Sequence, residues 1–327
     1  MAEKHSNFPA FLIAMRGKRL LHIGHQHADC DALGSAYAMS RILPGDVGFA
    51  GGMKIHAQAL ADFLELECVD NPNPANYDYT LIYDTLSVPL LGVPLPEHYA
   101  IFDHHESGGH RFSTIHNQLA DTAEWGWVWP TESTCSLLID LFQEHKIPID
   151  QKMGVALAAG IVTDTVRLQH AHGPALRHLS VALEAANRYV EDIWSVLDSS
   201  VIREARRPAI LKSLRTLKDV NHNGWSMLVT EIDSQDNAFV IMDTFIQLGW
   251  DIGLVGFPRG KETMVISVCT AELVLDAGVD LGGLMRALAP EVDASEAWGT
   301  RAAGRIIAPL ALDDLTARCV ETIRTAL

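Results

Sequence analysis

Short apolar runs alternate with amphipathic stretches along the first part of the chain. Brief apolar runs between polar or Gly/Pro-rich segments predict buried strands at 20–24, 47–50, 79–83 and 99–102. Apolar positions at helical spacing predict helices over 33–43, 56–66, 133–145, 153–162 and 176–197. Residues 106–130 are expected to form a loop. This alternation predicts an α/β domain built on a doubly wound parallel sheet.

The pattern changes near residue 200. An amphipathic stretch over 204–218 predicts a connecting helix. A second set of strands is predicted at 225–230, 250–257, 262–269 and 301–307, with helices at 237–248, 281–288 and 312–327. We therefore expect an N-terminal domain over 1–200, a connecting helix and linker over 201–222, and a smaller α/β domain over 223–327.

Ionisable side chains follow three of the predicted strands directly. Taken alone, an aspartate after a strand is often a helix N-cap, and a single histidine is usually structural or solvated. Three apolar strands that each end in Asp or His favour a metal site, because ligands bind at the carboxyl ends of strands in open α/β sheets. The candidate ligands are His25, Asp29, Asp31, Asp84, His104 and Asp164.

Four carboxylates and two imidazoles suit a pair of Mn²⁺ or Mg²⁺ ions, and the lack of thiolates favours Mn²⁺ over a structural zinc. Two such ions about 3.5–4 Å apart clamp a phosphoryl group and deprotonate a bridging water. Ions this close need a shared carboxylate, and Asp84, alone at its strand end, is the natural candidate.

The overall composition narrows the functional classes. Of the 327 residues, 48% are hydrophobic and 20% are charged, which is typical of a globular protein. A net charge of −16 argues against binding to duplex DNA through an extended basic face. Five scattered cysteines predict no disulfide framework and a cytoplasmic protein. No apolar run reaches about 18 residues, so no membrane span is expected, and the N-terminal stretch predicts an amphipathic helix rather than a signal peptide.

With these motifs the chain resembles the DHH superfamily of phosphoesterases. The pattern H-x-x-x-D-x-D-x-x-G-S is met from His25 to Ser35, and Asp84-Thr85 matches the second motif. The eponymous triplet is Asp103-His104-His105, and the fourth motif is met by Gly160-Ile161 with Thr163-Asp164-Thr165.

The resemblance implies a division of the ligands between two ions. One ion would be held by His25, Asp29 and Asp84. The other would be held by Asp31, Asp84, His104 and Asp164. The resemblance also implies that Asp103 orients His104 without touching an ion, and that His105 faces the substrate phosphate.

Two neighbours of the ligands have open roles. His27 either supports the ligands from behind or is an exposed loop histidine. Cys30 is expected to be buried filler rather than a thiolate ligand.

The C-terminal third resembles the DHHA1 substrate-binding domain but departs from its pattern. Arg301-Ala302-Ala303-Gly304 is retained, whereas the family's preceding G-G-G-H histidine is absent, and residues 267–270 read Ser-Val-Cys-Thr where an arginine is typical. Trp298 either stacks on a base or is a core residue. Arg301, Arg259 and Lys261 are candidates for holding a phosphate, the alternative being ordinary surface charge.

These observations predict a Mn²⁺-dependent phosphoesterase, with Mg²⁺ or Co²⁺ as candidate substitutes. Its expected substrates are short single-stranded oligonucleotides, as for an exonuclease-like enzyme, or small phosphorylated nucleotides. The alternatives are hydrolysis of polyphosphate or a cyclic dinucleotide, and a nucleotide-binding regulator without turnover. A homodimer is compatible with the sequence.

Overall fold

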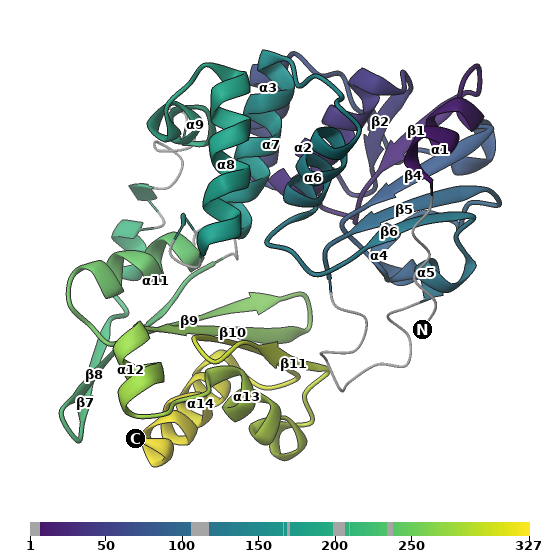
Figure 1. Cartoon of the computed structure of the whole chain (residues 1–327). Coiled ribbons are helices and arrows are strands. Elements are labelled where there is room, and N and C mark those ends of the chain that lie inside the picture. Colours follow the sequence, from purple (N-terminus) through teal and green to yellow (C-terminus); the bar gives the residue numbers. More distant parts are fainter. Residues whose placement is uncertain are drawn as a thin grey trace. The chain divides into compact units, whose positions relative to one another are not determined.

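The computed structural model describes residues 7–105, 118–165, 167–168, 171–198, 207–208, 210–233 and 238–327. The chain divides into two compact units, residues 1–199 and 200–327, each of which is described by itself (Figure 1). The junction of the units and the start of the expected connecting helix, at 199–206 and 209, lie outside the described residues.

The first unit is built on a six-stranded parallel sheet of order β3-β2-β1-β4-β5-β6, which confirms the predicted doubly wound α/β fold. Because the order runs outward in both directions from β1 and β4, the chain reverses its winding between these two strands. The strands are β1 (Leu20–Ile23), β2 (Asp46–Phe49), β3 (Val69–Asp70), β4 (Tyr79–Tyr83), β5 (Tyr99–Asp103) and β6 (Trp125–Val128).

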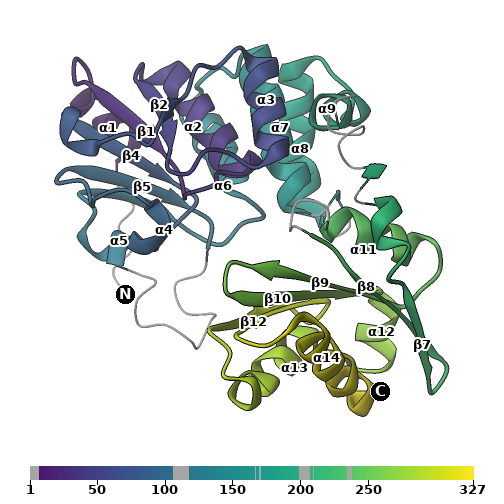
Figure 2. The same cartoon turned by 180° about the vertical axis from the view of Figure 1, so that it is seen from behind.

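Helices cover both faces of this sheet (Figures 1 and 2). One face packs in a single core with α1, α2, α3, α6 and α7, and the other packs with the short α4 and α5. The helices are α1 (Phe8–Ala14), α2 (Cys30–Ile42), α3 (Ile55–Leu64), α4 (Val88–Leu91), α5 (Gln118–Thr122), α6 (Thr134–Glu144), α7 (Gln151–Asp164), α8 (Gly173–Ala186) and α9 (Val190–Leu197).

Close helix packing brings α2 and α7 together behind the sheet. A Cβ on Gly34 of α2 would lie 2.5 Å from the carbonyl oxygen of Ala156, and one on Gly160 of α7 would lie 2.8 Å from Oδ1 of Asp31. Real Cβ atoms do not approach other atoms this closely, so both positions require glycine for the present spacing. The two glycines thus set how near Asp31 on α2 comes to Asp164 at the end of α7.

Several elements differ from the sequence-based expectation. Helix α2 begins at Cys30 rather than 33, because Asp29 caps it through a hydrogen bond from the Ala32 amide. The expected helix over 176–197 is two helices, since Asn187 adopts φ +52° and ends α8. The expected loop over 106–130 contains α5 and β6, and β6 adds a strand to the sheet edge.

The second unit contains a mixed six-stranded sheet of order β11-β12-β10-β9-β8-β7, in which only the β8–β9 pair is parallel. Strand β7 occupies the end of the stretch expected to link the domains. The strands are β7 (Lys218–His222), β8 (Trp225–Glu231), β9 (Ile252–Arg259), β10 (Glu262–Cys269), β11 (Glu296–Gly299) and β12 (Ala303–Ala308).

Helix α11 (Ala238–Gln247) packs on one face of the second sheet, and α12 (Ala271–Asp276), α13 (Leu281–Leu288) and α14 (Leu312–Ala326) pack on the other. Each unit therefore has its own hydrophobic core. All five cysteines are free thiols, and no helix in the described part of the chain is both long and apolar enough to cross a bilayer.

Candidate metal centre

Three neighbouring strands of the first sheet lead to ionisable residues at their carboxyl-terminal ends. Strand β1 leads to His25, β4 leads to Asp84, and β5 ends in Asp103 and continues into His104 and His105. These strands are adjacent and parallel, so their carboxyl ends meet. Asp84 adopts φ +59°, which turns the chain sharply as it leaves the strand.

One set of ligand atoms forms around His25. Its Nε2 lies 3.2 Å from Oδ2 of Asp29 and 3.6 Å from Oδ2 of Asp84. The three ligand atoms of this group lie within 4.8 Å of one another, a spacing that suits one ion.

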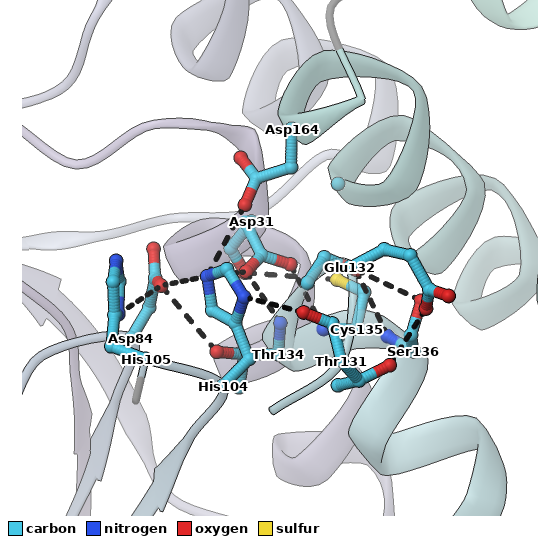
Figure 3. Close-up of polar contacts among 12 residues, drawn as sticks. Asp31, Asp84, His104, His105, Thr131, Glu132, Thr134, Cys135, Ser136 and Asp164 are labelled. Atoms are coloured by element: carbon cyan, nitrogen blue, oxygen red, sulfur yellow. Dashed lines mark hydrogen bonds and ion pairs between the residues drawn. The ribbon is translucent and has the colours of Figure 1, made fainter. Parts of the chain in front are cut away.

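A second set forms around His104 (Figure 3). Its Nε2 lies 3.3 Å from Oδ1 of Asp84, 3.4 Å from Oδ2 of Asp164 and 3.9 Å from Oδ2 of Asp31. Asp84 therefore turns one carboxylate oxygen to each histidine, the arrangement that a ligand shared by two ions requires. The structure thus brings together all six residues that the sequence singled out as metal ligands.

The histidine ring orientations fit a metal centre. Nδ1 of His25 lies 2.9 Å from the Gln26 carbonyl oxygen, and Nδ1 of His104 lies 3.1 Å from the Thr131 carbonyl oxygen. A carbonyl oxygen only accepts hydrogen bonds, so both Nδ1 atoms must donate. In the neutral ring the lone pair is then on Nε2, which is the nitrogen that faces the carboxylates, and histidine ligands are usually held in this manner.

The histidine pKa values show that the site attracts positive charge. Burial alone would lower the pKa of His25, but hydrogen bonds and charges from Asp29 and Asp84 raise it to about 11. His104 is likewise raised to a pKa of about 11, against the effect of burial, by Asp84 and then by the other carboxylates. Without metal ions, protons on the two rings therefore supply part of the positive charge between the carboxylates.

The carboxylates divide into two kinds. Burial and the neighbouring carboxylate charges raise the pKa of Asp31 and of Asp164. Burial alone would also raise the pKa of Asp84 and of Asp29. Hydrogen bonds from the histidines outweigh burial and hold the pKa of each carboxylate well below its usual value. Buried carboxylates that repel one another in this way are stabilised by divalent cations, and the oxygen and imidazole donors suit Mn²⁺ or Mg²⁺.

No protein-family model matches the chain. An uncharacterized protein of Methanocaldococcus jannaschii is 23% identical over 304 residues, which cover 89% of this chain and 87% of that protein. An exopolyphosphatase-related protein of Bacteroides fragilis has a similar structure over 97% of this chain and 94% of its own, with a TM-score of 0.66 and 12% sequence identity.

RecJ of Thermus thermophilus, solved in complex with Mn²⁺, is similar over 97% of this chain and 53% of its own, with a TM-score of 0.52 and 14% identity. Both solved proteins contain a DHH domain. The chain has the DHH-superfamily fold. At these identities the likeness concerns the fold, which is the arrangement that brings the strand ends of this chain together.

Within the DHH fold of this chain, Asp103 contacts a different histidine from the one expected. Its Oδ1 accepts hydrogen bonds from the backbone amide of His105 at 2.6 Å and from Nδ1 of His105 at 2.8 Å. The expectation that Asp103 orients His104 is therefore wrong, because the Thr131 carbonyl holds that ring instead. Among the described residues no hydrogen bond is formed by Nε2 of His105, and the side chain is 57% exposed.

A segment that the sequence did not single out surrounds the second ligand set of the DHH fold. We call residues 131–135, which join β6 to α6, the β6–α6 segment. The backbone amides of Thr134 and Cys135 donate to the two carboxylate oxygens of Asp31 at 2.6 and 2.9 Å. The Thr134 hydroxyl donates to Oδ1 of Asp84 at 3.4 Å. With the Thr131 carbonyl on His104, the segment touches three predicted ligands of the second ion (Figure 3).

Lys54 is a second residue that the sequence did not indicate. Its Nζ lies 2.9 Å from Oδ2 of Asp29, the same oxygen that faces His25. The side chain is half-exposed, so an ammonium group stands at the rim of the ligand set. His27 is exposed and bonds the Gly51 carbonyl, and Cys30 is buried with a pKa well above its usual value because of burial.

Apart from His105, the predicted substrate-binding residues lie in the second unit. Trp298 is 44% exposed rather than a core residue, and the guanidinium of Arg305 lies 3.9 Å from its ring centroid. Glu296 pairs with Arg305 at 3.2 Å and with Arg259 at 3.8 Å.

The other two cationic candidates are also exposed. Arg301 donates to the Val274 carbonyl oxygen at 3.2 Å, and Lys261 lies in the turn between β9 and β10. Of the residues predicted to bind substrate, Arg259 and Trp298 are therefore the ones joined in a single cluster, through Glu296 and Arg305.

Proposed function

We propose that the protein is a metal-dependent phosphoesterase that hydrolyses short oligonucleotides or small phosphorylated nucleotides with a pair of Mn²⁺ ions. The observation that carries the proposal is the pair of histidines whose Nδ1 atoms are held by backbone carbonyls while their Nε2 atoms face the shared carboxylate of Asp84. In this assignment His25, Asp29 and Asp84 hold the first ion, and Asp31, Asp84, His104 and Asp164 hold the second.

Two divalent ions in such a site supply Lewis acidity that activates a water nucleophile and neutralises phosphate oxygens. The protein's own residues account for the rest of the chemistry. Asp103 fixes the ring of His105, and its hydrogen bond raises the pKa of that histidine against the effect of burial. Nε2 of His105 then donates to a phosphate oxygen as charge develops in the transition state. Lys54 adds a positive charge at the rim, where an anionic substrate approaches.

The second unit is assigned the role of substrate binding. The exposed ring of Trp298, backed by Arg305, offers a surface on which a base stacks. Such a surface favours a nucleotide substrate over polyphosphate, which has no base. Arg259, Arg301 and Lys261 are the proposed phosphate contacts. RecJ, solved with Mn²⁺, and an exopolyphosphatase-related protein share the fold of this chain. These two likenesses are compatible with hydrolysis of either a phosphate ester or a phosphoanhydride by this chain.

A substrate panel tests this proposal. The protein is incubated with Mn²⁺, Mg²⁺ or Co²⁺ and with short RNA and DNA oligomers, phosphoadenosine phosphate, cyclic dinucleotides and polyphosphate. We expect Mn²⁺-dependent release of nucleotide or phosphate from the oligomers or small nucleotides. Release from polyphosphate alone would contradict the nucleotide assignment. Tight nucleotide binding without release of any product would contradict the enzyme proposal and favour a nucleotide-binding regulator.

A further inference from the structure

A group of ionisable side chains outside the six predicted ligands lies against the β6–α6 segment. Its members come from three places in the first unit: Glu132 in the segment itself, Asp140 on α6, and His172 and His178 at the start of α8 and within it. None of them has a role in the centre described above. Their contacts show what they hold in place.

Glu132 is almost fully buried, with 4% of its side chain exposed, and three side chains contact its carboxylate. The Thr131 hydroxyl donates to Oε2 at 2.6 Å, and Nδ1 of His178 lies 3.3 Å from the same oxygen. Nδ1 of His172 lies 3.2 Å from Oε1. An ionised carboxylate only accepts hydrogen bonds, so Nδ1 of His178 donates to it, while Nδ1 of His172 lies at ion-pair distance. Removing the two histidines would leave this buried charge with fewer partners, chiefly the Thr131 hydroxyl, which is costly.

His178 connects this carboxylate to a second helix. Its Nε2 lies 2.9 Å from Oδ1 of Asp140, so the ring donates from both nitrogens and stands as an imidazolium between two carboxylates. The hydrogen bond with Asp140 raises the pKa of His178, in agreement with that geometry. Because Asp140 lies on α6 and His178 on α8, the ring ties Glu132 to both helices.

The β6–α6 segment held in this way contacts mainly the second ligand set of the metal centre. It supplies the Thr131 carbonyl to His104 and the first amides of α6 to Asp31, both predicted ligands of the second ion (Figure 3). Its one contact with the shared ligand is the 3.4 Å bond from Thr134 to Asp84. Among the described residues, His25 and Asp29 have no hydrogen bond or ion pair with the segment. A loosened segment should therefore weaken the second ion and spare the first.

We infer that Glu132, clamped by His178 and His172, is a positioning residue that sets the affinity and geometry of the second metal ion. The inference rests on the two-ion centre of the proposed function. It adds that Glu132, His178 and His172, whose side chains touch no predicted ligand, determine how tightly and in which position the second ion binds. Loss of an outer hydrogen-bond partner of this kind typically lowers metal affinity about 10- to 100-fold.

Two substitutions in the full-length protein test the inference from opposite ends. Glu132→Gln keeps the side-chain volume but turns an amide N–H toward a histidine N–H. His178→Gln breaks the same clamp without altering the β6–α6 segment, and Asp140 is half-exposed, so water replaces its lost partner. Glu65→Gln is the control, because Glu65 pairs with Lys152 on the surface of the same unit.

The measurements are a Mn²⁺ titration by calorimetry and the EPR signal of magnetically coupled Mn²⁺ pairs. For both clamp variants we expect a second binding step about 10-fold weaker, an unchanged first step and a reduced coupled-pair signal. Glu65→Gln should match the wild type. The double variant should be no weaker than either single one, because both break one clamp.

Several outcomes would overturn the inference: equal weakening of both steps, an unchanged second step in a folded His178→Gln protein, or a wild type that binds one ion. Two intact binding steps without hydrolysis of any substrate would instead remove the proposed function and leave the clamp standing.

Discussion

Asp84 is the residue on which the two ligand sets converge, and it is 5% exposed. Asp84→Asn removes the negative charge but keeps the side-chain shape. We expect loss of both ions and at least about a 100-fold loss of activity, because an amide oxygen is a poor bridge between two cations. Calorimetric Mn²⁺ titration and substrate turnover measure the two effects.

The control for this variant lies at the other end of the same strand. Asp78 is partly exposed and pairs with Arg19 at 2.8 Å, so Asp78→Asn should bind Mn²⁺ like the wild type. Undiminished ion binding and activity in Asp84→Asn would remove the shared-ligand assignment.

His22, on β1, is a buried histidine that serves the fold rather than the site. Its Nε2 donates to the Leu43 carbonyl at 2.9 Å, and Nδ1 accepts from the Tyr83 hydroxyl at 2.8 Å, so the neutral ring is fully paired. Burial lowers its pKa from 6.5 to about 4. As the pH falls, His22 is therefore protonated near pH 6.5 in the unfolded chain but only near pH 4 in the folded chain.

This difference predicts a stability contribution from His22 that is complete above pH 6.5 and is lost as the pH falls toward 4, by about 3 kcal/mol in total. Urea unfolding of wild type and His22→Gln at pH 7 and pH 5 measures it. The wild type should lose more stability between these two pH values than the variant does. Equal losses would show that the ring is protonated in the folded state.

At the scale of elements, the spacing of α2 and α7 depends on Gly34. Gly34→Ala would place a Cβ 2.5 Å from the Ala156 carbonyl oxygen, a backbone atom that cannot move without its helix. We expect destabilisation of about 1–3 kcal/mol, although alanine is the better helix former. Urea unfolding gives the free energy, and Mn²⁺ titration should show a weaker second ion because Asp31 moves with α2.

Gly173 is the matched control, since it opens α8 and, of the described residues, a Cβ there would meet just the end of the Arg177 side chain at 3.4 Å. Gly173→Ala should be neutral or slightly stabilising. If the two alanine variants were equally stable, close packing of α2 on α7 would not be what requires glycine at position 34.

For the whole molecule, the division into two units places all six predicted ligands, from His25 to Asp164, in the first. Each unit has its own core, so calorimetric unfolding of the full chain should resolve two transitions. Mn²⁺ at about 100 times its dissociation constant should stabilise the first unit by about 2.7 kcal/mol and leave the other transition unchanged.

In the Asp84→Asn variant the Mn²⁺ effect should disappear while both transitions remain. If Mn²⁺ raised the temperature of the second unit's transition alone, the ions would bind to the second unit and the assignment to the first would be wrong.

The sequence by itself determined the alternation of strands and helices, the parallel sheet and the six candidate ligands. Hydrophobic periodicity is a local property, and a residue that directly follows a buried strand must lie at the carboxyl-terminal end of the sheet. The same reasoning missed β6, where three tryptophans and a glycine obscure the strand pattern, and joined α8 to α9 across Asn187, whose left-handed conformation no periodicity reveals.

Only the tertiary structure decided what surrounds the ligands. The amides that hold Asp31 come from residues more than a hundred positions later, and the carbonyl that holds His104 comes from Thr131. Lys54 reaches Asp29 from the start of another helix, and Asp103 bonds His105 rather than His104. Contacts of this kind depend on how elements pack in space, whereas His25, Asp84 and His104 are placed by the short chain that follows each strand.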